Sequence, residues 1–380
     1  MHKYTRVNIV GAFGEENFGD DLLFLVTDSL LLKRIQPKEI WVSVSDLRKG
    51  SYLRDWIDPV RFIKRFHPTP RSWDLKIYAG GTQFYSFPVD DATHFTNKLL
   101  QRLVAGVRRE GLLRFLYIHT RKLFIKKPFS IAIGIGVGPF LSGNEDNSRR
   151  VLKLLDLTWV RDSSSFFQLK KWDIKNVFEG ADICFSGNVF DITRRPAELT
   201  GIQNVGIVVR GWSYQTAAQH YECHLLDLAR WVRSLGYSVT FFAFCAPVDQ
   251  KVIDYLRSED ELVDVWNPRV DSVQQYIARI AKQDIFISSR YHGIVIASLI
   301  GIPSIGLSLD PKVSLICDRL GLGEYVLEAP FSPVEFKAKF LNLVQHYPIV
   351  KQEVEVKTRH EQKIADTMID DVLEHLGCNN

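Results

Sequence analysis

The sequence has few cysteines, and none has the spacing of a zinc site or of a disulfide framework. The 380 residues include five cysteines, Cys184, Cys223, Cys245, Cys317 and Cys378, with no Cys-x-x-Cys pair. Their number is odd and they lie far apart, so neither structural zinc nor paired disulfides are indicated. We expect no bound metal and a reducing compartment.

Long apolar runs and a strong charge of one sign are also missing. No run reaches the roughly 18 apolar residues that span a bilayer. The N-terminal "MHKYTRVNIV" lacks the apolar core and cleavage site of a signal peptide. The net charge of +4 is too mild to indicate nucleic-acid binding. We predict a cytoplasmic protein that does not bind nucleic acid.

The chain is long enough for two domains, since single hydrophobic cores rarely grow beyond about 250 to 300 residues. Its composition, 46% hydrophobic and 24% charged, is that of a globular protein. Short apolar runs alternate with helix-length segments, which predicts parallel strands buried on both faces. In the first half these runs are RVNIV, EIWVSV, LKIYAGG, FSIAIGIGVG, LTWV and NVFEGADICF.

The same pattern restarts after residues 191–201, DITRRPAELTG, which are the best linker candidate. Apolar runs such as NVGIVV, TFFAFC and DIFIS then alternate with helices expected near 216–234, 248–257, 272–281 and 294–300. The predicted fold class is α/β, with two doubly wound Rossmann-like domains facing across a cleft. We place the domains at 1–195 and 196–350, followed by a C-terminal helix in 351–380 that can pack back on the first domain.

Arg290 and His292 follow the strand DIFIS directly before an apolar helix pattern. In an extended segment, side chains two residues apart point to the same side, so both can meet one ligand. The N-terminus of the helix adds backbone NH groups and a positive dipole end, which predicts an anion site. For the isolated pair, an equal alternative is that both side chains merely satisfy backbone carbonyls.

Arg210 strengthens the anion interpretation, because it ends the strand GIVV at a corresponding position of the second domain. Buried cations that converge on one cleft are costly unless an anion neutralises them. Asp310 and Lys312 follow the next strand and can line the same edge. A surface turn built around Pro311 is an equal alternative for these two residues.

The first domain offers polar and glycine residues after two of its strands. Asn17 and Asp20 lie in GEENFGDD, where they can cap a helix or contact a sugar, with about equal weight. Gly80 and Gly81 end another strand and allow close approach by a ligand, although tight helix packing explains such glycines as well.

Residues 98–127 form a strongly basic stretch with apolar residues at helical spacing. Nine Lys or Arg and one Glu lie between Asn97 and Phe129. This pattern is typical of a membrane-surface element, and a solvated helical face is an equal alternative.

Several of these motifs together resemble the polysaccharide pyruvyl transferase family. They are NFGDDLLF, GGTQF, GIGVGP, VRD, GIVVRG and above all SRYHGIVIASLIGIPSIGLSLDPK, in the expected order from Asn17 to Lys312. Asp21 and Thr82 depart mildly from the pattern. The resemblance implies a GT-B-like fold and transfer of pyruvyl from phosphoenolpyruvate to sugar hydroxyls, commonly as a ketal on a bacterial surface polysaccharide or its precursor.

The resemblance also implies roles for individual residues. Arg210, Arg290, His292 and Lys312 look like the donor-binding set, with His292 and Arg290 catalytic. Possible acceptor contacts are Asn17, Asp20, Gly80, Gly81 and Thr82. No cofactor is implied beyond phosphoenolpyruvate as co-substrate.

Acceptors in such pathways are often lipid-linked saccharides, so the basic stretch 98–127 can hold the enzyme at the inner face of the cytoplasmic membrane.

Two alternatives to pyruvyl transfer stay open. One is a nucleotide-sugar-dependent glycosyltransferase of the same fold. The other is a non-catalytic carbohydrate-binding member.

Overall fold

The structure is a computed structural model that describes residues 3–57, 60–64, 72–86, 127–140, 145–186, 201–211 and 221–378. The linker candidate up to residue 200 and nearly all of the basic stretch, 98–126, lie outside the described residues. Among the helices described, none combines the length and apolar character needed to cross a membrane.

The first half of the chain builds a parallel sheet in the order β3-β2-β1-β4-β5-β6-β7. Its strands are β1 (Arg6–Val10), β2 (Glu39–Val44), β3 (Val60–Lys64), β4 (Leu75–Ser86), β5 (Phe129–Phe140), β6 (Leu157–Val160) and β7 (Val177–Glu179). Six of them are the predicted apolar runs. The edge strand β3 was not predicted, because its sequence VRFIK alternates charged and apolar residues instead of forming a buried run.

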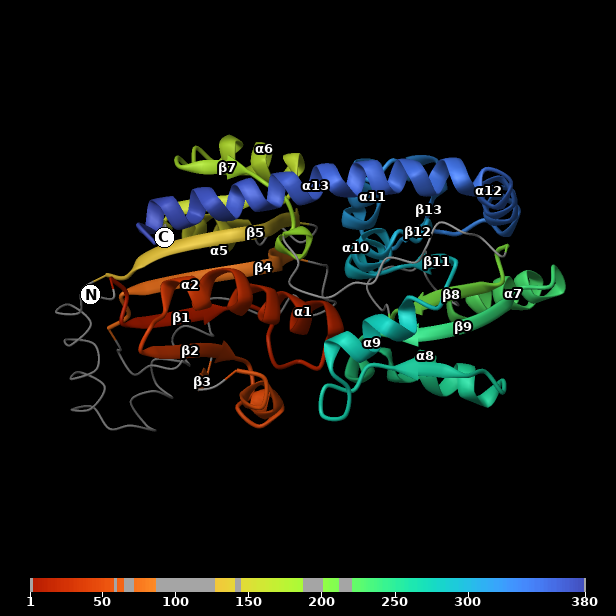
Figure 1. Cartoon of the computed structure of the whole chain (residues 1–380), viewed down its shortest axis with the longest axis horizontal. Helices are drawn as coiled ribbons and strands as arrows, with labels where there is room; N and C mark the ends of the chain where they lie inside the picture. Colours follow the sequence, from red (N-terminus) through yellow and green to blue (C-terminus); the bar gives the residue numbers. More distant parts are fainter. Residues whose placement is uncertain are drawn as a thin grey trace.

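The second half builds a parallel sheet in the order β10-β9-β8-β11-β12-β13. Its strands are β8 (Asn204–Val209), β9 (Ser238–Ala243), β10 (Val263–Val265), β11 (Ile285–Ser288), β12 (Ser304–Ser308) and β13 (Val326–Glu328). In both sheets the strand order reverses beside the first strand of the domain, as in Rossmann folds. The predicted fold class is confirmed, with two α/β lobes side by side in Figure 1.

Helices cover both sheets and connect their strands. They are α1 (Phe18–Thr27), α2 (Lys33–Ile35), α5 (Glu145–Leu152), α6 (Ser163–Lys171), α7 (Tyr221–Ser234), α8 (Ala246–Ser258), α9 (Val273–Ile280), α10 (Tyr291–Ile300), α11 (Pro311–Arg319), α12 (Pro333–Gln345) and α13 (Tyr347–Leu376). Shorter turns are η1 (Asp28–Leu32), η2 (Lys49–Arg54), η3 (Ile183–Phe185) and η5 (Gly323–Tyr325).

The two lobes share a packed junction at the start of α1. The Phe18 ring lies 4.9 Å from Phe244 and 5.2 Å from Trp266, both in the second domain, and its backbone NH donates to the Phe244 carbonyl at 2.8 Å. Asp21 is fully buried and accepts hydrogen bonds from Tyr52 of the first domain (2.5 Å) and Trp266 of the second (2.8 Å). The first turn of α1 is therefore fixed to both domains.

The long helix α13 crosses from the second lobe back over the first (Figure 1). Near its start, the Tyr347 hydroxyl donates to the Asp284 carbonyl beside β11 at 2.9 Å. Near its end, Asp371 accepts from the Trp159 indole of β6 at 2.7 Å. Its 30 residues are long enough, at about 1.5 Å per residue, to contact both sheets and brace one against the other.

Candidate functional site

A cavity of about 250 Å³ lies where the carboxyl ends of strands from both sheets meet. This is the edge at which doubly wound sheets bind ligands. Its walls include most of the residues singled out from the sequence: Asn17, Asp20, Gly81, Thr82, Arg210, Arg290, His292 and Lys312. Segments far apart along the chain thus converge on one small space.

Gly80 does not line this cavity. Its φ is +54°, and a Cβ added there would lie 2.4 Å from Leu23 Cδ2 of α1. Glycine is required at position 80 because α1 packs tightly against β4 in a left-handed stretch of backbone. The structure therefore favours the packing alternative for Gly80, whereas Gly81 faces the cavity.

Arg290 is held rigidly by the second domain. It is the N-cap residue of α10, and its Nε donates to the Val209 carbonyl at the end of β8 at 3.2 Å. Its Nη2 pairs with the fully buried carboxylate of Asp249. Asp249 also accepts from the backbone NH groups of Gly211 (2.8 Å) and Cys245 (3.1 Å), which fixes the guanidinium facing the cavity.

His292 lies inside the first turn of α10, because that helix begins at Tyr291 and not near residue 294 as predicted. The extended geometry expected for Arg290 and His292 is therefore wrong, although both side chains line the cavity. The imidazole packs against α1: a Cβ on Gly19 would lie 2.1 Å from its Nδ1. Only glycine at position 19 leaves room for this ring.

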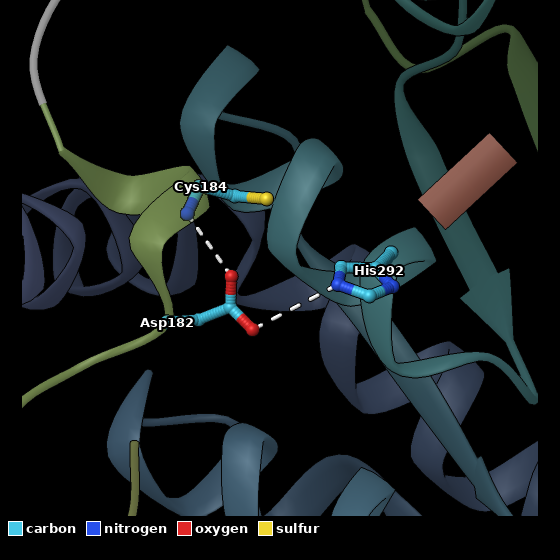
Figure 2. Close-up of side chains that lie close together, drawn as sticks. All are labelled: Asp182, Cys184 and His292. Atoms are coloured by element: carbon cyan, nitrogen blue, oxygen red, sulfur yellow. Dashed lines mark hydrogen bonds and ion pairs between the residues drawn. The ribbon is translucent and has the colours of Figure 1, made fainter. Parts of the chain in front are cut away.

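The other imidazole nitrogen faces a buried carboxylate. His292 Nε2 lies 3.7 Å from Asp182 Oδ2 (Figure 2). Asp182 stands at the start of η3 and also accepts from Arg161 Nη1 (3.1 Å) and the Cys184 backbone NH (3.0 Å). Burial alone would raise the pKa of Asp182, but His292 and Arg161 outweigh it and hold the pKa well below its usual range. Asp182 is therefore ionised beside the imidazole.

Asp182, Cys184 and His292 also place three metal-ligand atoms within 4.8 Å of one another. The charges around them do not suit a cation. The Arg161 guanidinium already forms an ion pair with the Asp182 carboxylate. Burial raises the pKa of the Cys184 thiol well above its usual value, which keeps the thiol protonated. The three residues fit a histidine paired with a carboxylate better than a metal centre.

Lys312 and Asp310 form a second ion pair at the cavity. Asp310 is 1% exposed and caps α11, so of the two alternatives the structure favours a place at the cavity edge over a surface turn for this residue. Lys312 Nζ lies 2.9 Å from Asp310 Oδ2, and Arg210 Nη2 lies 4.0 Å from the same oxygen. Burial and the neighbouring Arg210 charge lower the pKa of Lys312 to about 8, against the attraction of Asp310.

Asn17 and Asp20 come from the first turn of α1. Asn17 is the N-cap residue, and its side chain accepts from the Gly19 backbone NH at 3.2 Å, so the cap belongs to Asn17 and not to Asp20. Both residues also line the cavity. Burial raises the pKa of Asp20, although His292, Lys312 and Arg290 oppose this shift. Asp20 is thus a carboxyl group suited to accepting a proton.

Arg161, directly after β6, is part of the cavity wall. It is 2% exposed, stacks over the Tyr291 ring at 3.8 Å and donates to Thr82 Oγ1 at 2.9 Å. Sequence reasoning missed its role together with Asp182 and Asp249. The sequence feature that could have indicated these three residues is a charged side chain at the end of an apolar run or inside one.

The electrostatics of the site differ from the expectation of buried cations that only an anion could neutralise. Arg161, Arg210, Arg290 and Lys312 line the cavity. Asp182, Asp249 and Asp310 are buried and pair with these cations. The buried carboxylates therefore fix the positions of these cationic side chains before a ligand binds. A ligand does not need to reorganise them.

The sequence matches the polysaccharide pyruvyl transferase family model over residues 17–311. No curated protein matches it. Similar solved structures include Anabaena HepE in complex with UDP and glucose, at 11% identity and TM-score 0.57, with 99% of this chain and 100% of that chain covered.

Another is the UDP-GlcNAc 2-epimerase of Neisseria meningitidis bound to UDP-GlcNAc, at 10% identity and TM-score 0.59, with 98% of this chain and 99% of that chain covered. At such identities the similarity establishes the GT-B architecture alone.

Proposed function

The chain belongs to the polysaccharide pyruvyl transferase family, and on that premise we propose that it transfers the pyruvyl group of phosphoenolpyruvate to hydroxyls of a saccharide. The observation that carries the proposal is the convergence of Arg210, Arg290, Lys312 and His292 on one small cavity. The His292 imidazole also faces the buried Asp182 carboxylate. The proposed product is a pyruvate ketal on a bacterial surface polysaccharide or its lipid-linked precursor. Phosphoenolpyruvate serves as co-substrate, with no further cofactor.

The size and charge of the cavity suit this donor. Its volume of about 250 Å³ is below the roughly 300–1,000 Å³ of pockets for drug-sized ligands. Phosphoenolpyruvate carries a carboxylate and a phosphate on a three-carbon frame. Arginine forks at 210 and 290 match such planar or tetrahedral anions, and Lys312 supplies a point charge. The N-terminus of α10 adds the positive end of its dipole.

We assign the proton transfers to two side chains that line the cavity, His292 and Asp20. An acceptor hydroxyl attacks C2 of the donor and gives its proton to Asp20, while protonated His292 donates a proton to the methylene carbon. A second hydroxyl then forms the other C2–O bond and gives its proton to the neutral His292, while the bond from C2 to the phosphate oxygen breaks and phosphate leaves with the proton held by Asp20. Asp182, whose carboxylate faces the imidazole, keeps the ring oriented.

Calorimetric titration with phosphoenolpyruvate and, separately, with UDP-sugars tests the donor. We expect phosphoenolpyruvate to bind and Arg290→Ala to weaken binding about 10- to 100-fold, because a charge-assisted pair is lost. Arg359→Ala is the matched control, since Arg359 lies on α13 with 54% of its side chain exposed. Binding of UDP-sugars alone would replace the proposal with glycosyl transfer. If neither ligand bound, a non-catalytic carbohydrate-binding protein would be favoured.

The acceptor is proposed to be lipid-linked and presented at the inner face of the cytoplasmic membrane, with the basic stretch 98–127 as the membrane contact. The support is its composition, nine Lys or Arg against one Glu between Asn97 and Phe129. Co-sedimentation with vesicles containing phosphatidylglycerol tests this idea. Failure to bind at low salt would rule it out.

A further inference from the structure

A second cavity of about 260 Å³ adjoins the first. The two share Thr82, Arg161 and Lys312 as wall residues. The second cavity lies between the end of β5 and the start of α6 in the first domain, and the start of α11 in the second. A ligand held there would meet a ligand of the first cavity across these three shared side chains.

The charges of the two cavities differ in kind. The first is lined by Arg161, Arg210, Arg290 and Lys312 against the single carboxyl group of Asp20. The second has Arg161 and Lys312 balanced by Glu145 and Asp162. A strongly anionic ligand therefore prefers the first cavity, and a neutral polar ligand fits the second.

The remaining wall residues of the second cavity suit a saccharide. Ser164 and Gln168 of α6 and the Glu145 carboxylate provide mixed donors and acceptors for hydroxyl groups. Phe140 adds an apolar ring face, and its ring packs 5.4 Å from Trp172, which holds it in place. Glu145, Ser164 and Pro311 are exposed, so the cavity opens to solvent and can admit a ligand that extends beyond it.

Arg161 supplies a buried polar group in the wall that the two cavities share. Its side chain is 2% exposed, yet its Nε has no hydrogen-bond partner among the described residues, with the Asp162 carboxylate 3.8 Å away. A buried donor without a partner is costly unless a ligand or water accepts from it. A saccharide hydroxyl at the junction of the two cavities would satisfy this NH group.

We propose that the second cavity binds the acceptor saccharide, with a pyranose ring near Phe140 and its reacting hydroxyls at Arg161 and Lys312. The inference rests on the proposed function and adds the place of the acceptor. It moves the acceptor away from Asn17 and Gly81, which line the donor cavity, and keeps Thr82 as a contact for both ligands.

Saturation-transfer NMR with p-nitrophenyl pyranosides of the gluco, galacto, manno and N-acetylglucosamine configurations tests the subsite. We expect at least one glycoside to bind, and Gln168→Leu to weaken its binding about fivefold, the effect of one lost hydrogen bond. Gln345→Leu is the matched control, because Gln345 is exposed on α12 and lines neither cavity. Phosphoenolpyruvate affinity, measured by calorimetry, should be unchanged in both variants.

The subsite would be overturned if no glycoside bound to the wild-type chain, or if Gln168→Leu left glycoside binding unchanged. The proposed function fails in a different way. If a glycoside bound through Gln168 while phosphoenolpyruvate did not bind at all, the saccharide subsite would stand and pyruvyl transfer from this donor would not.

Discussion

The two walls of the cleft differ in their chemistry. The second domain contributes Arg210, Arg290, His292 and Lys312, whereas the first contributes Asn17, Asp20, Thr82 and Arg161. In the proposed reaction the second domain binds the anionic donor, and the first supplies the base and the carboxylate that faces His292. The comparison teaches that neither domain is chemically complete, so activity depends on how the lobes are joined.

The His292–Asp182 pair joins the two walls, and breaking it should have the largest effect. We expect His292→Ala to reduce turnover about 10²- to 10⁴-fold, the usual contribution of a general acid. Asp182→Asn should retain the shape of the side chain and lose its charge, with a loss of turnover of up to about 10⁴-fold. Steady-state rates measured over a range of pH values check both variants.

A purely structural role for Asp182 would lower the affinity for phosphoenolpyruvate together with turnover. Loss of the charge that faces His292 should instead lower turnover and leave the affinity for phosphoenolpyruvate unchanged, which calorimetry checks. Asp370→Asn is the control, because Asp370 lies on α13 with 76% of its side chain exposed and lines neither cavity. Near-normal turnover and an unchanged pH profile in His292→Ala would remove His292 from the acid role.

Loss of the Lys312 charge should have a smaller effect, because this residue belongs to the second domain and does not link the two domains. Its pKa of about 8 means that the ammonium charge is present below pH 8 and is lost above it. We expect the affinity for phosphoenolpyruvate to fall by up to about tenfold per pH unit above 8. The phosphate itself, with a second pKa of about 6, is already ionised in that range.

Lys312→Met should bind phosphoenolpyruvate more weakly at pH 7 and should lack this dependence on pH. Calorimetry between pH 7 and pH 9.5 measures both chains. An affinity of the wild-type chain that stays flat across this interval would show that Lys312 does not contact the donor.

The smallest effect concerns the joint between the lobes. Burial raises the pKa of Asp21 to about 8, against the hydrogen bonds from Tyr52 and Trp266. Because the folded state binds this proton more tightly than the unfolded state, stability should fall as pH rises from about 4 to 8. Asp21→Asn removes the charge, and its side-chain oxygen can still accept from Trp266 while its NH2 group donates to the Tyr52 hydroxyl. Its melting temperature should therefore exceed that of the wild type by a few degrees at pH 9.

At pH 4 to 5 the carboxyl group of Asp21 is protonated in the folded chain, and the difference between the two melting temperatures should shrink. Thermal unfolding followed by circular dichroism at both pH values checks this. Equal melting temperatures at pH 9 would contradict a raised pKa of Asp21 at the junction between the lobes.

The sequence predicted most strands of both sheets and missed one edge strand of each, β3 and β13. Long apolar runs such as those of β5 and β12 identify buried parallel strands from local composition. The strand β3 alternates charged and apolar residues, and β13 has three residues, so neither forms a continuous buried run. The start of α10 was placed three residues late, because Tyr291 and His292 are polar and break the apolar pattern that marks the helix.

The candidate site was predicted where its residues follow a strand directly, as Arg210, Arg290 and His292 do. Asp182 and Asp249 were missed because their importance comes from partners far away in sequence: Asp182 faces His292 and Arg161, and Asp249 pairs with Arg290. From the sequence, Gly80 could serve either close approach by a ligand or tight packing of a helix. The contact with Leu23 that favours packing is seen only in the tertiary structure.

By itself, the sequence determined the two α/β lobes and the residues that end their strands, because hydrophobic periodicity and strand-end residues are local properties. Only the tertiary structure decided which carboxylate faces which cation, and that a second, charge-balanced cavity adjoins the first. Those relations depend on strand order, on the packing of α1 between the lobes and on α13 across both. Such long-range contacts are set by the burial of the whole chain and leave no local pattern to read.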